Sequence, residues 1–482
     1  MRWRFILNTV GVLILFFGVT MAVPLGFDLF AKNRSLIPII KAMGLTLLCG
    51  SFLLAIFRHG KTETISQREG MAIVAFGWTA IGLFGALPFY FSSPSFCFVD
   101  AFFESVSGFT TTGSSILTDI ERLSPGLLIW RSFIQWLGGM GIIVLSIAIL
   151  PFLGVGGMQL YKAEVPSPVP DKLKPRIQDT AIVLWRVYAL FTAAEVVLLM
   201  VGGMSFFDAL NHAFTTMPTG GFSTKNASMA HYGSVYIDIV ITGFMLLAGI
   251  NFSLHYQLLR GRPLALWKDA ECRFYLAMCF ILTIVVGINI YGTVYTEIGQ
   301  AFRYAAFQVV SIVTTTGYAT ADYAMWPAMS QILIFLCMFV GASAGSTGGG
   351  MKCLRIMLCC RYCYRELFTL IHPRSVTHIK IGGKPVSEEI VRSVLGFLAL
   401  YMALFVLSTV LLAGIGVDFI TALSAVAATI GNIGPGFGMV GPVENFSQIP
   451  YWGKWLLAWC MLLGRLEIYT LIVLVVPEFW RK

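Results

Sequence analysis

The amino-acid sequence predicts an all-α polytopic membrane protein with a fourfold internal repeat, and three observations lead to this fold class. The chain has 482 residues, of which 57% are hydrophobic and only 12% are charged, about half the charged fraction of a soluble domain. Apolar runs long enough to cross roughly 30 Å of hydrocarbon recur from one end to the other. A unit of one span, one short apolar segment and a second span occurs four times.

Each long apolar run predicts one membrane-spanning helix. We expect ten spans, near residues 5–25, 37–58, 70–92, 127–153, 179–203, 234–259, 273–294, 327–360, 388–415 and 451–477. The first run follows a basic N-terminus, as in a signal peptide. It is longer than the apolar region of a typical signal and lacks a clean A-x-A site, so we expect an uncleaved span.

Lysine and arginine gather in alternate loops, which is the positive-inside pattern. The basic clusters lie at 58–68, 162–176, 260–273 and 352–384, and the intervening loops carry almost none. An even number of spans places both termini on one side, so we expect the basic loops and both termini to be cytoplasmic. The net charge of +9 belongs to these loops and indicates no nucleic-acid partner.

The ten cysteines do not predict disulfides, because most lie in apolar spans or in one basic loop. That loop contains Cys353, Cys359, Cys360 and Cys363, but no second pair and no histidine follow at the spacing of a zinc site. We expect reduced thiols on the cytoplasmic side and no cofactor.

Four short apolar segments between spans align without a gap. Each has alanine in second place and glycine in fourteenth place. They are DAFFESVSGFTTTG (Asp100–Gly113), DALNHAFTTMPTGG (Asp208–Gly221), YAAFQVVSIVTTTG (Tyr304–Gly317) and TALSAVAATIGNIG (Thr421–Gly434). The alignment divides the chain into two extra N-terminal helices at 1–69 and four pore repeats at 70–178, 179–272, 273–387 and 388–482.

A segment of this length between spans is a candidate for a re-entrant half-helix followed by an extended return. Irregular backbone is tolerated at membrane depth only where it is buried in protein or lines water. Four such segments in pseudo-fourfold arrangement around a central pore satisfy this condition. Glycine at the turn allows a positive φ, so that carbonyl oxygens can point to the axis and replace the hydration shell of an alkali cation. The C-terminal ends of the half-helices also favour a cation. Taken singly, any one of these glycines could be an ordinary turn residue.

Several further strings resemble the Trk/Ktr/HKT superfamily of potassium transporters, and the whole chain is most similar to its bacterial Trk-type (TrkH-like) membrane subunits. The strings are TTTGSS, QWLGGMGIIVL, PTGGFST, GINFSLHY, TTTGYAT, GASAGSTGGGMK, GNIGPGFG and GRLEIYT. The resemblance implies a potassium-binding selectivity filter at Thr110, Thr111, Thr112, Gly113, Thr219, Gly220, Gly221, Thr315, Thr316, Gly317, Asn432, Ile433 and Gly434. Glycine at the first position, where sodium-preferring plant relatives have serine, favours potassium. The fourth repeat departs most from the pattern, because Asn432-Ile433-Gly434-Pro435 replaces a threonine-rich strand.

Two further features resemble the gate of this family. GASAGSTGGG (Gly341–Gly350) interrupts the eighth span, and a stretch so rich in glycine does not form a stable lipid-facing helix. The resemblance implies a gate made of Gly345, Ser346, Thr347, Gly348, Gly349, Gly350 and Arg465. Arg465 lies mid-span, where a charge is costly and usually functional. Its alternative is a structural pair with Glu467 or a nearby carbonyl, and Lys352 is a weaker gate candidate.

The resemblance also implies the setting: potassium uptake across the bacterial inner membrane, a lipid bilayer around a homodimer, and a soluble nucleotide-binding regulatory ring (TrkA-like). No enzymatic activity is expected. A sodium-permeable or Na⁺-coupled relative is the first alternative. A membrane-embedded serine hydrolase using Ser343 is the second, but its G-x-S-x-G string lacks the strand–turn–helix context.

Seven further polar residues have structural interpretations. Glu104 either adds negative potential near the pore or binds backbone. His212 and His255 are expected to be hydrogen-bonded structural residues. Glu195, Asp238, Arg131 and Arg186 are expected to join helices to one another.

Overall fold

The computed structural model describes residues 1–30, 36–57, 66–92, 96–148, 177–375 and 377–481. Regular structure in these residues is helical apart from one two-stranded antiparallel ladder, β1 (Lys380–Ile381) with β2 (Lys384–Pro385). The predicted all-helical membrane architecture is confirmed, with this small hairpin as its exception.

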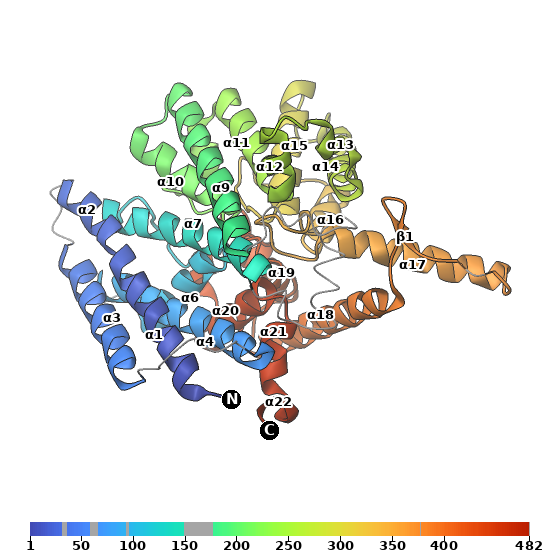
Figure 1. The fold of residues 1–482 in the computed structure, drawn as a ribbon. Coiled ribbons are helices and arrows are strands. Elements are labelled where there is room, and N and C mark those ends of the chain that lie inside the picture. The colour runs from blue at the N-terminus through green and yellow to red at the C-terminus, as the bar shows by residue number, and fades with distance from the viewer. Residues whose placement is uncertain (31–35, 58–65, 93–95, 149–176, 376, 482) are drawn as a thin grey trace.

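The N-terminal helices pack on each other at one edge of the molecule (Figure 1). They are α1 (Trp3–Thr20), α2 (Ala22–Phe30) and α3 (Leu36–Ile56). Glycine lets α1 and α3 approach closely, since a methyl group on Gly50 would lie 2.9 Å from the amide nitrogen of Leu15. Small residues at such contacts are typical of helix pairs in membranes.

The first helix of each predicted repeat is long. These helices are α4 (Gln67–Gly85) with its continuation α5 (Leu87–Ser92), α9 (Ile177–Val201), α14 (Ala270–Ile290) and α18 (Glu388–Gly414). Together with Trp3–Phe30 and Leu36–Ile56 they supply the six described segments that are long and apolar enough to cross a membrane.

A short helix follows each of them. The four are α6 (Phe98–Phe109), α10 (Phe206–Thr216), α15 (Ile298–Val313) and α19 (Phe419–Ile430). The last is capped by Asp418, whose carboxylate accepts the amide of Thr421 at 3.0 Å. Hydrogen bonds from the side chain and amide of Thr421 hold the pKa of Asp418 below its ordinary value. This cap fixes where α19 begins.

The second helix of each repeat is unbroken only in the first. There, α7 (Pro125–Ala148) is one helix, and predicted span residues 149–153 lie outside the described part of the chain. The others are α11 (Val235–Ala248) with α12 (Phe252–Leu259), α16 (Ala328–Cys337) with α17 (Cys353–Ile371), and α20 (Tyr451–Arg465) with α21 (Tyr469–Ile472). The remaining short elements are α13 (Leu264–Lys268), α22 (Pro477–Trp480) and the 3₁₀ turns η2 (Ser228–Tyr232), η3 (Tyr323–Met325), η4 (Gly438–Val440), η5 (Phe446–Gln448) and η6 (Val473–Val475).

The prediction of one continuous helix over 234–259 and over 451–477 is wrong. The first pair bends by 104° and the second by 112°. Asn251 accepts the amide of Ser253 at 2.9 Å and so starts a new helix. In the second pair, Glu467 and Ile468 have φ of 59° and 50°, which no helix accommodates. The predicted break at 341–350 is present, and beyond it α17 projects from the molecule (Figure 1).

The repeats contact one another in a regular order. In the first, second and fourth repeats the second helix packs on the short helix of the next repeat: α7 on α10, α11 on α15, and α20 on α6. The chain ends also meet, because Trp3 stacks on Trp480 at 5.6 Å and Arg68 donates to the carbonyl of Arg481 at 2.7 Å. Both termini therefore lie on one side of the helices (Figure 1), as an even number of spans predicts.

Candidate functional site

Each short helix ends in the same unusual backbone conformation. The residue two places before the glycine has a positive φ although it is not glycine, with 52° at Thr111, 58° at Thr219, 61° at Thr315 and 54° at Asn432. The glycines follow with φ of 85° at Gly113, 73° at Gly221, 80° at Gly317 and 107° at Gly434. A left-handed non-glycine residue costs about 1–2 kcal/mol. Four of them at equivalent places indicate a conformation kept for function.

The four glycines close into a ring. A methyl group on Gly113 would lie 2.1 Å from the carbonyl oxygen of Gly220, and one on Gly221 would lie 1.9 Å from that of Thr316. The series continues from Gly317 to Ile433 at 1.9 Å and returns from Gly434 to Thr112 at 2.9 Å. Each glycine thus faces the carbonyl that precedes the glycine of the next repeat. We call these eight residues the glycine ring.

Equivalent hydrogen bonds hold the ring in every repeat. The amide of the residue before each glycine donates to the carbonyl five residues earlier in the short helix. The pairs are Thr112 to Ser107 at 2.9 Å, Gly220 to Thr215 at 2.8 Å, Thr316 to Ser311 at 2.8 Å and Ile433 to Ala428 at 2.8 Å. These bonds pair carbonyls at the helix ends that have no partner within the helix. The ring carbonyls take no part in them.

The threonine hydroxyls lie partly outside the ring. Thr110 donates to the carbonyl of Val106 at 2.7 Å and contacts the hydroxyl of Thr112 at 2.7 Å. The Thr111 hydroxyl is buried without a hydrogen-bond partner among the described residues. In the fourth repeat, the side-chain amide of Asn432 donates to the Thr112 hydroxyl at 2.9 Å and so ties the fourth repeat to the first.

Gln135 supports the ring from α7 and is a residue that sequence reasoning did not single out. Its side-chain nitrogen donates to the carbonyl of Gly220 at 2.8 Å, and its oxygen accepts the amide of Phe222 at 3.2 Å. The two bonds bracket Gly221. The string QWLGG contains this glutamine, but nothing in the sequence indicates which repeat it contacts.

The first repeat contains a buried ion pair between Arg131 and Glu104. Glu104 is 0% exposed and accepts from Arg131 at 2.8 Å and from the amide of Ile116 at 3.0 Å. Arg131 also donates to the carbonyl of Ser223 at 3.0 Å, which joins the first repeat to the second. Of the two interpretations of Glu104, binding to backbone fits this geometry. Arg131 joins segments as expected.

The two histidines make the structural contacts expected of them. His212 contacts the carbonyl of Asp208 at 2.8 Å and the hydroxyl of Ser223 at 3.1 Å, and His255 contacts the carbonyl of Leu247 at 2.8 Å.

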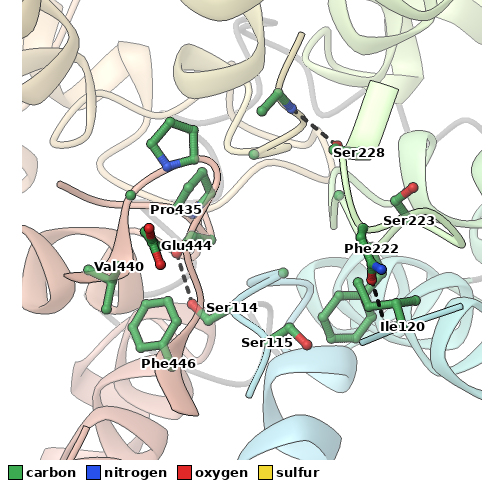
Figure 2. A pocket seen from close by; sticks show the side chains of 18 of the residues that line it. Ser114, Ser115, Ile120, Phe222, Ser223, Ser228, Pro435, Val440, Glu444 and Phe446 are labelled. Carbon is green, nitrogen blue, oxygen red and sulfur yellow. Dashed lines mark hydrogen bonds between the residues drawn. The ribbon is translucent and has the colours of Figure 1, made fainter. Parts of the chain in front are cut away.

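A cavity of about 90 Å³ opens on one side of the ring, and all four glycines line it. Figure 2 shows Ser114 donating to the carbonyl of Gly434, at 3.0 Å, beside Pro435. The lining also contains Arg131, Lys225 and Glu444. A dehydrated ion leaving this cavity through the ring would meet carbonyl oxygens contributed by four repeats.

The loop between α16 and α17 lies beside the ring through residues 347–349. The amide of Gly349 donates to the Thr315 hydroxyl at 2.7 Å, and the Thr347 hydroxyl donates to the carbonyl of Met217 at 2.9 Å. The bend between α11 and α12 contacts the loop, because the amide of Phe252 donates to the carbonyl of Gly345 at 3.1 Å.

Arg465 is 2% exposed and reaches the same loop. It donates to the carbonyl of Thr347 at 2.8 Å and to that of Gly138 at 3.4 Å. Glu467 pairs instead with Arg355. Of the two forms of the structural alternative, the geometry does not show a pair with Glu467, but it does show bonds to nearby carbonyls. The Thr347 carbonyl belongs to the proposed gate, so the loop residues and the arginine do meet.

Lys352 donates to the carbonyl of Gly348 within the loop. The proposed hydrolase serine, Ser343, lies in irregular chain, and its amide donates to the carbonyl of Gly249 at 3.0 Å. Among the described residues no group of His, Cys, Asp or Glu could hold a metal ion.

A helical membrane fold whose short helices converge on a ring of backbone carbonyls defines a cation transport protein and not an enzyme. The chain belongs to the TrkH family, whose profile, described as "Cation transport protein", matches residues 38–482. It is 43% identical to the Trk system potassium uptake protein TrkH of Escherichia coli K12, over 100% of both chains. It is 34% identical to TrkG of the same organism, over 99% of both. The crystal structure of the potassium transporter TrkH from Vibrio parahaemolyticus superposes with a TM-score of 0.92 at 40% identity, over 100% of both chains.

Proposed function

We propose that this protein takes up potassium across the bacterial inner membrane through the glycine ring. The observation that carries the proposal is the closure of the ring, in which each glycine faces the carbonyl of the next repeat. Residues 70–178, 179–272, 273–387 and 388–482 then form four pseudo-fourfold pore repeats. Backbone carbonyls replace the hydration shell of the ion without adding a fixed charge.

The potassium-binding residues in this proposal are those of the ring and the residues beside it. They are Thr110, Thr111, Thr112, Gly113, Thr219, Gly220, Gly221, Thr315, Thr316, Gly317, Asn432, Ile433 and Gly434. The relatives named above are potassium uptake proteins, which supports potassium as the ion. Backbone oxygens dominate the set, because several of the hydroxyls are engaged in hydrogen bonds of their own.

The proposed gate is the tip of the loop, Gly345–Gly350, together with Arg465. Two contacts support this: Gly349 donates to Thr315, the neighbour of the ring residue Thr316, and Arg465 of α20 donates to the carbonyl of Thr347. A buried positive charge beside the path also repels cations while the loop is in place. Opening would require the tip to leave these contacts.

Transport needs no energy-transducing site in this chain. Inward movement of one positive charge down the membrane potential releases about 2.3 kcal/mol per 100 mV. We further propose a homodimer and a cytosolic nucleotide-binding regulatory ring (TrkA-like), which would contact the basic loops. Co-purification of the chain with such a subunit from its host tests this. Full regulation of the purified chain in vesicles without any partner would contradict it.

The test of the main proposal is uptake of ⁸⁶Rb⁺ into lipid vesicles that contain the purified chain. Uptake should depend on an inside-negative potential, and unlabelled K⁺ should compete far better than Na⁺. Equal competition by Na⁺, or uptake that requires a Na⁺ gradient, would favour the sodium-permeable or Na⁺-coupled alternative. No uptake at all would refute cation conduction.

A further inference from the structure

One carboxylate from another helix holds both ends of the loop between α16 and α17. Glu271 lies in the first turn of α14 and is 1% exposed. Its Oε1 atom accepts the amide of Ala344 at 2.7 Å and the amide of Leu354 at 3.0 Å. The two amides belong to opposite ends of the loop, so this single oxygen holds the start and the end of the loop together.

The two ends also bond to each other. The amide of Gly341 donates to the carbonyl of Met351 at 2.7 Å, and the amide of Cys353 donates to the carbonyl of Ala342 at 3.2 Å. The Cys353 thiol donates to the carbonyl of Gly341 at 3.2 Å. We call residues 341–344 and 351–354 the stem. With Glu271, the stem forms a closed, buried unit on α14.

The tip, residues 345–350, is bounded by glycines in the left-handed region, with φ of 73° at Gly345 and 63° at Gly350. Its contacts go to three repeats: Gly349 donates to Thr315 of the same repeat, Thr347 donates to Met217 of the second repeat, and Arg465 of the fourth repeat donates to Thr347. Glycine can change its backbone angles at low steric cost. Stem and tip therefore differ in attachment, because Glu271 on α14 holds both ends of the stem, whereas the tip is held by side chains and backbone of several repeats beside the ring.

We propose that Glu271 is a positioning residue that fixes the stem on α14, so that opening moves the tip alone. This inference rests on the proposed gating role of the loop. Hydrogen bonds to an ionised carboxylate are roughly twice as strong as neutral ones. Two such bonds to one carboxylate fix the stem, whereas the tip is held by bonds that reach several repeats, including the one from Arg465 to Thr347. Without the carboxylate, the two ends of the loop would lose their shared contact with α14, and the closed position of the tip would lose its definition.

The experiment compares Glu271→Ala, Glu271→Gln and the unchanged protein in lipid vesicles. Glu271→Ala removes the acceptor and should raise the resting ⁸⁶Rb⁺ leak by about tenfold or more, since loss of two such bonds shifts a two-state equilibrium by at least that factor. Glutamine keeps an oxygen at the same place and should restore most of the closed state. Preference for K⁺ over Na⁺ should be unchanged in both, because the ring is untouched.

Asp28→Asn is the matched control. Asp28 is also fully buried and accepts a backbone amide, that of Gly126, at 2.7 Å, but it lies on α2 away from the loop. It should lower the thermal unfolding temperature and leave the leak unchanged. Alkylation of Cys353, mapped by mass spectrometry, adds a local measurement. This buried thiol should react in Glu271→Ala and stay protected in Glu271→Gln and Asp28→Asn.

Each outcome separates this inference from the proposed gate. If deletion of residues 345–350 raises the leak and Glu271→Ala does not, the gate stands and the role of Glu271 is refuted. A leak in Glu271→Ala that has lost K⁺ preference would also refute it, because the ring itself would then be disturbed. If neither change alters the leak, the gating role of the loop fails. If Glu271→Ala does not fold, Glu271→Gln decides: a normal leak with Cys353 protected supports the inference, and a normal leak with Cys353 exposed overturns it.

Discussion

Gly113→Ser tests the glycine ring most directly. A Cβ atom at Gly113 would lie 2.1 Å from the carbonyl oxygen of Gly220, whereas real Cβ atoms essentially never come closer than 3.0 Å to another atom. The carbonyl must therefore retreat by about 0.9 Å, the difference between these distances. The neighbouring chain cannot absorb this easily, because Gln135 holds the same carbonyl. We expect one of the four ring oxygens to leave its place.

The magnitude follows from the value of one ion–carbonyl contact. If that contact is worth as much as a hydrogen bond to a charged group, about 1.5–3 kcal/mol, its loss lowers the preference for K⁺ by roughly tenfold to a hundredfold. The assay is ⁸⁶Rb⁺ uptake into vesicles with Na⁺ as competitor. The inhibition constant for Na⁺ should approach that for K⁺ in the variant.

Gly434→Ser is the internal comparison. The same Cβ atom there would lie 2.9 Å from the carbonyl oxygen of Thr112, only about 0.1 Å inside the limit of 3.0 Å. Its φ of 107° strains any side chain, so expression should fall, but the remaining protein should discriminate better than Gly113→Ser. Full K⁺ preference in Gly113→Ser would refute the assignment of the ring as the filter. Equal loss in both variants would refute the role given to the carbonyl contact.

The proposed gate and the buried ion pair allow three further tests. Deletion of Gly345–Gly350 should leave a constitutively leaky pore, and unchanged ⁸⁶Rb⁺ flux would remove the gating role. Arg465→Ala loses its bond to the Thr347 carbonyl, worth about 1.5–3 kcal/mol, so resting flux should rise at least tenfold; Arg465→Lys, which keeps the charge, should be intermediate, and wild-type flux in Arg465→Ala would argue against the barrier. Glu104→Gln leaves the Arg131 guanidinium buried without its carboxylate and should cost about 3–5 kcal/mol of stability, which a thermal unfolding scan in detergent measures; an unchanged midpoint would contradict this.

The sequence predicts the parts of the fold that depend on hydrophobicity and repetition. Apolar runs are a direct consequence of the bilayer, so the long helices α9 and α18 lie within a few residues of their predicted positions. The alignment of four segments on one glycine anticipates a shared backbone conformation. That conformation is present at Gly113, Gly221, Gly317 and Gly434.

Contacts between separate segments were not predictable from the sequence, because they depend on how parts distant in the chain meet. Nothing in the sequence pairs Gln135 with Gly220 or Glu271 with the stem of the loop. The bend at Asn251 was also missed, since an asparagine within an apolar run reads as an ordinary polar residue until its side chain is seen to cap a helix. The positive φ of Asn432 was not predicted either, because no glycine marks that position in the sequence.

The glycine ring is built from one polypeptide, and this has a consequence for how its properties can change. In an assembly of four identical chains, a single codon change alters every quarter of the ring at once. Here the quarters are already unequal, because a Cβ atom would lie 2.9 Å from the neighbouring carbonyl oxygen at Gly434 and 2.1 Å or less from it at the other three glycines. A mutation can therefore change one quarter at a time, and ion preference can change in small steps while the other three quarters are unaltered.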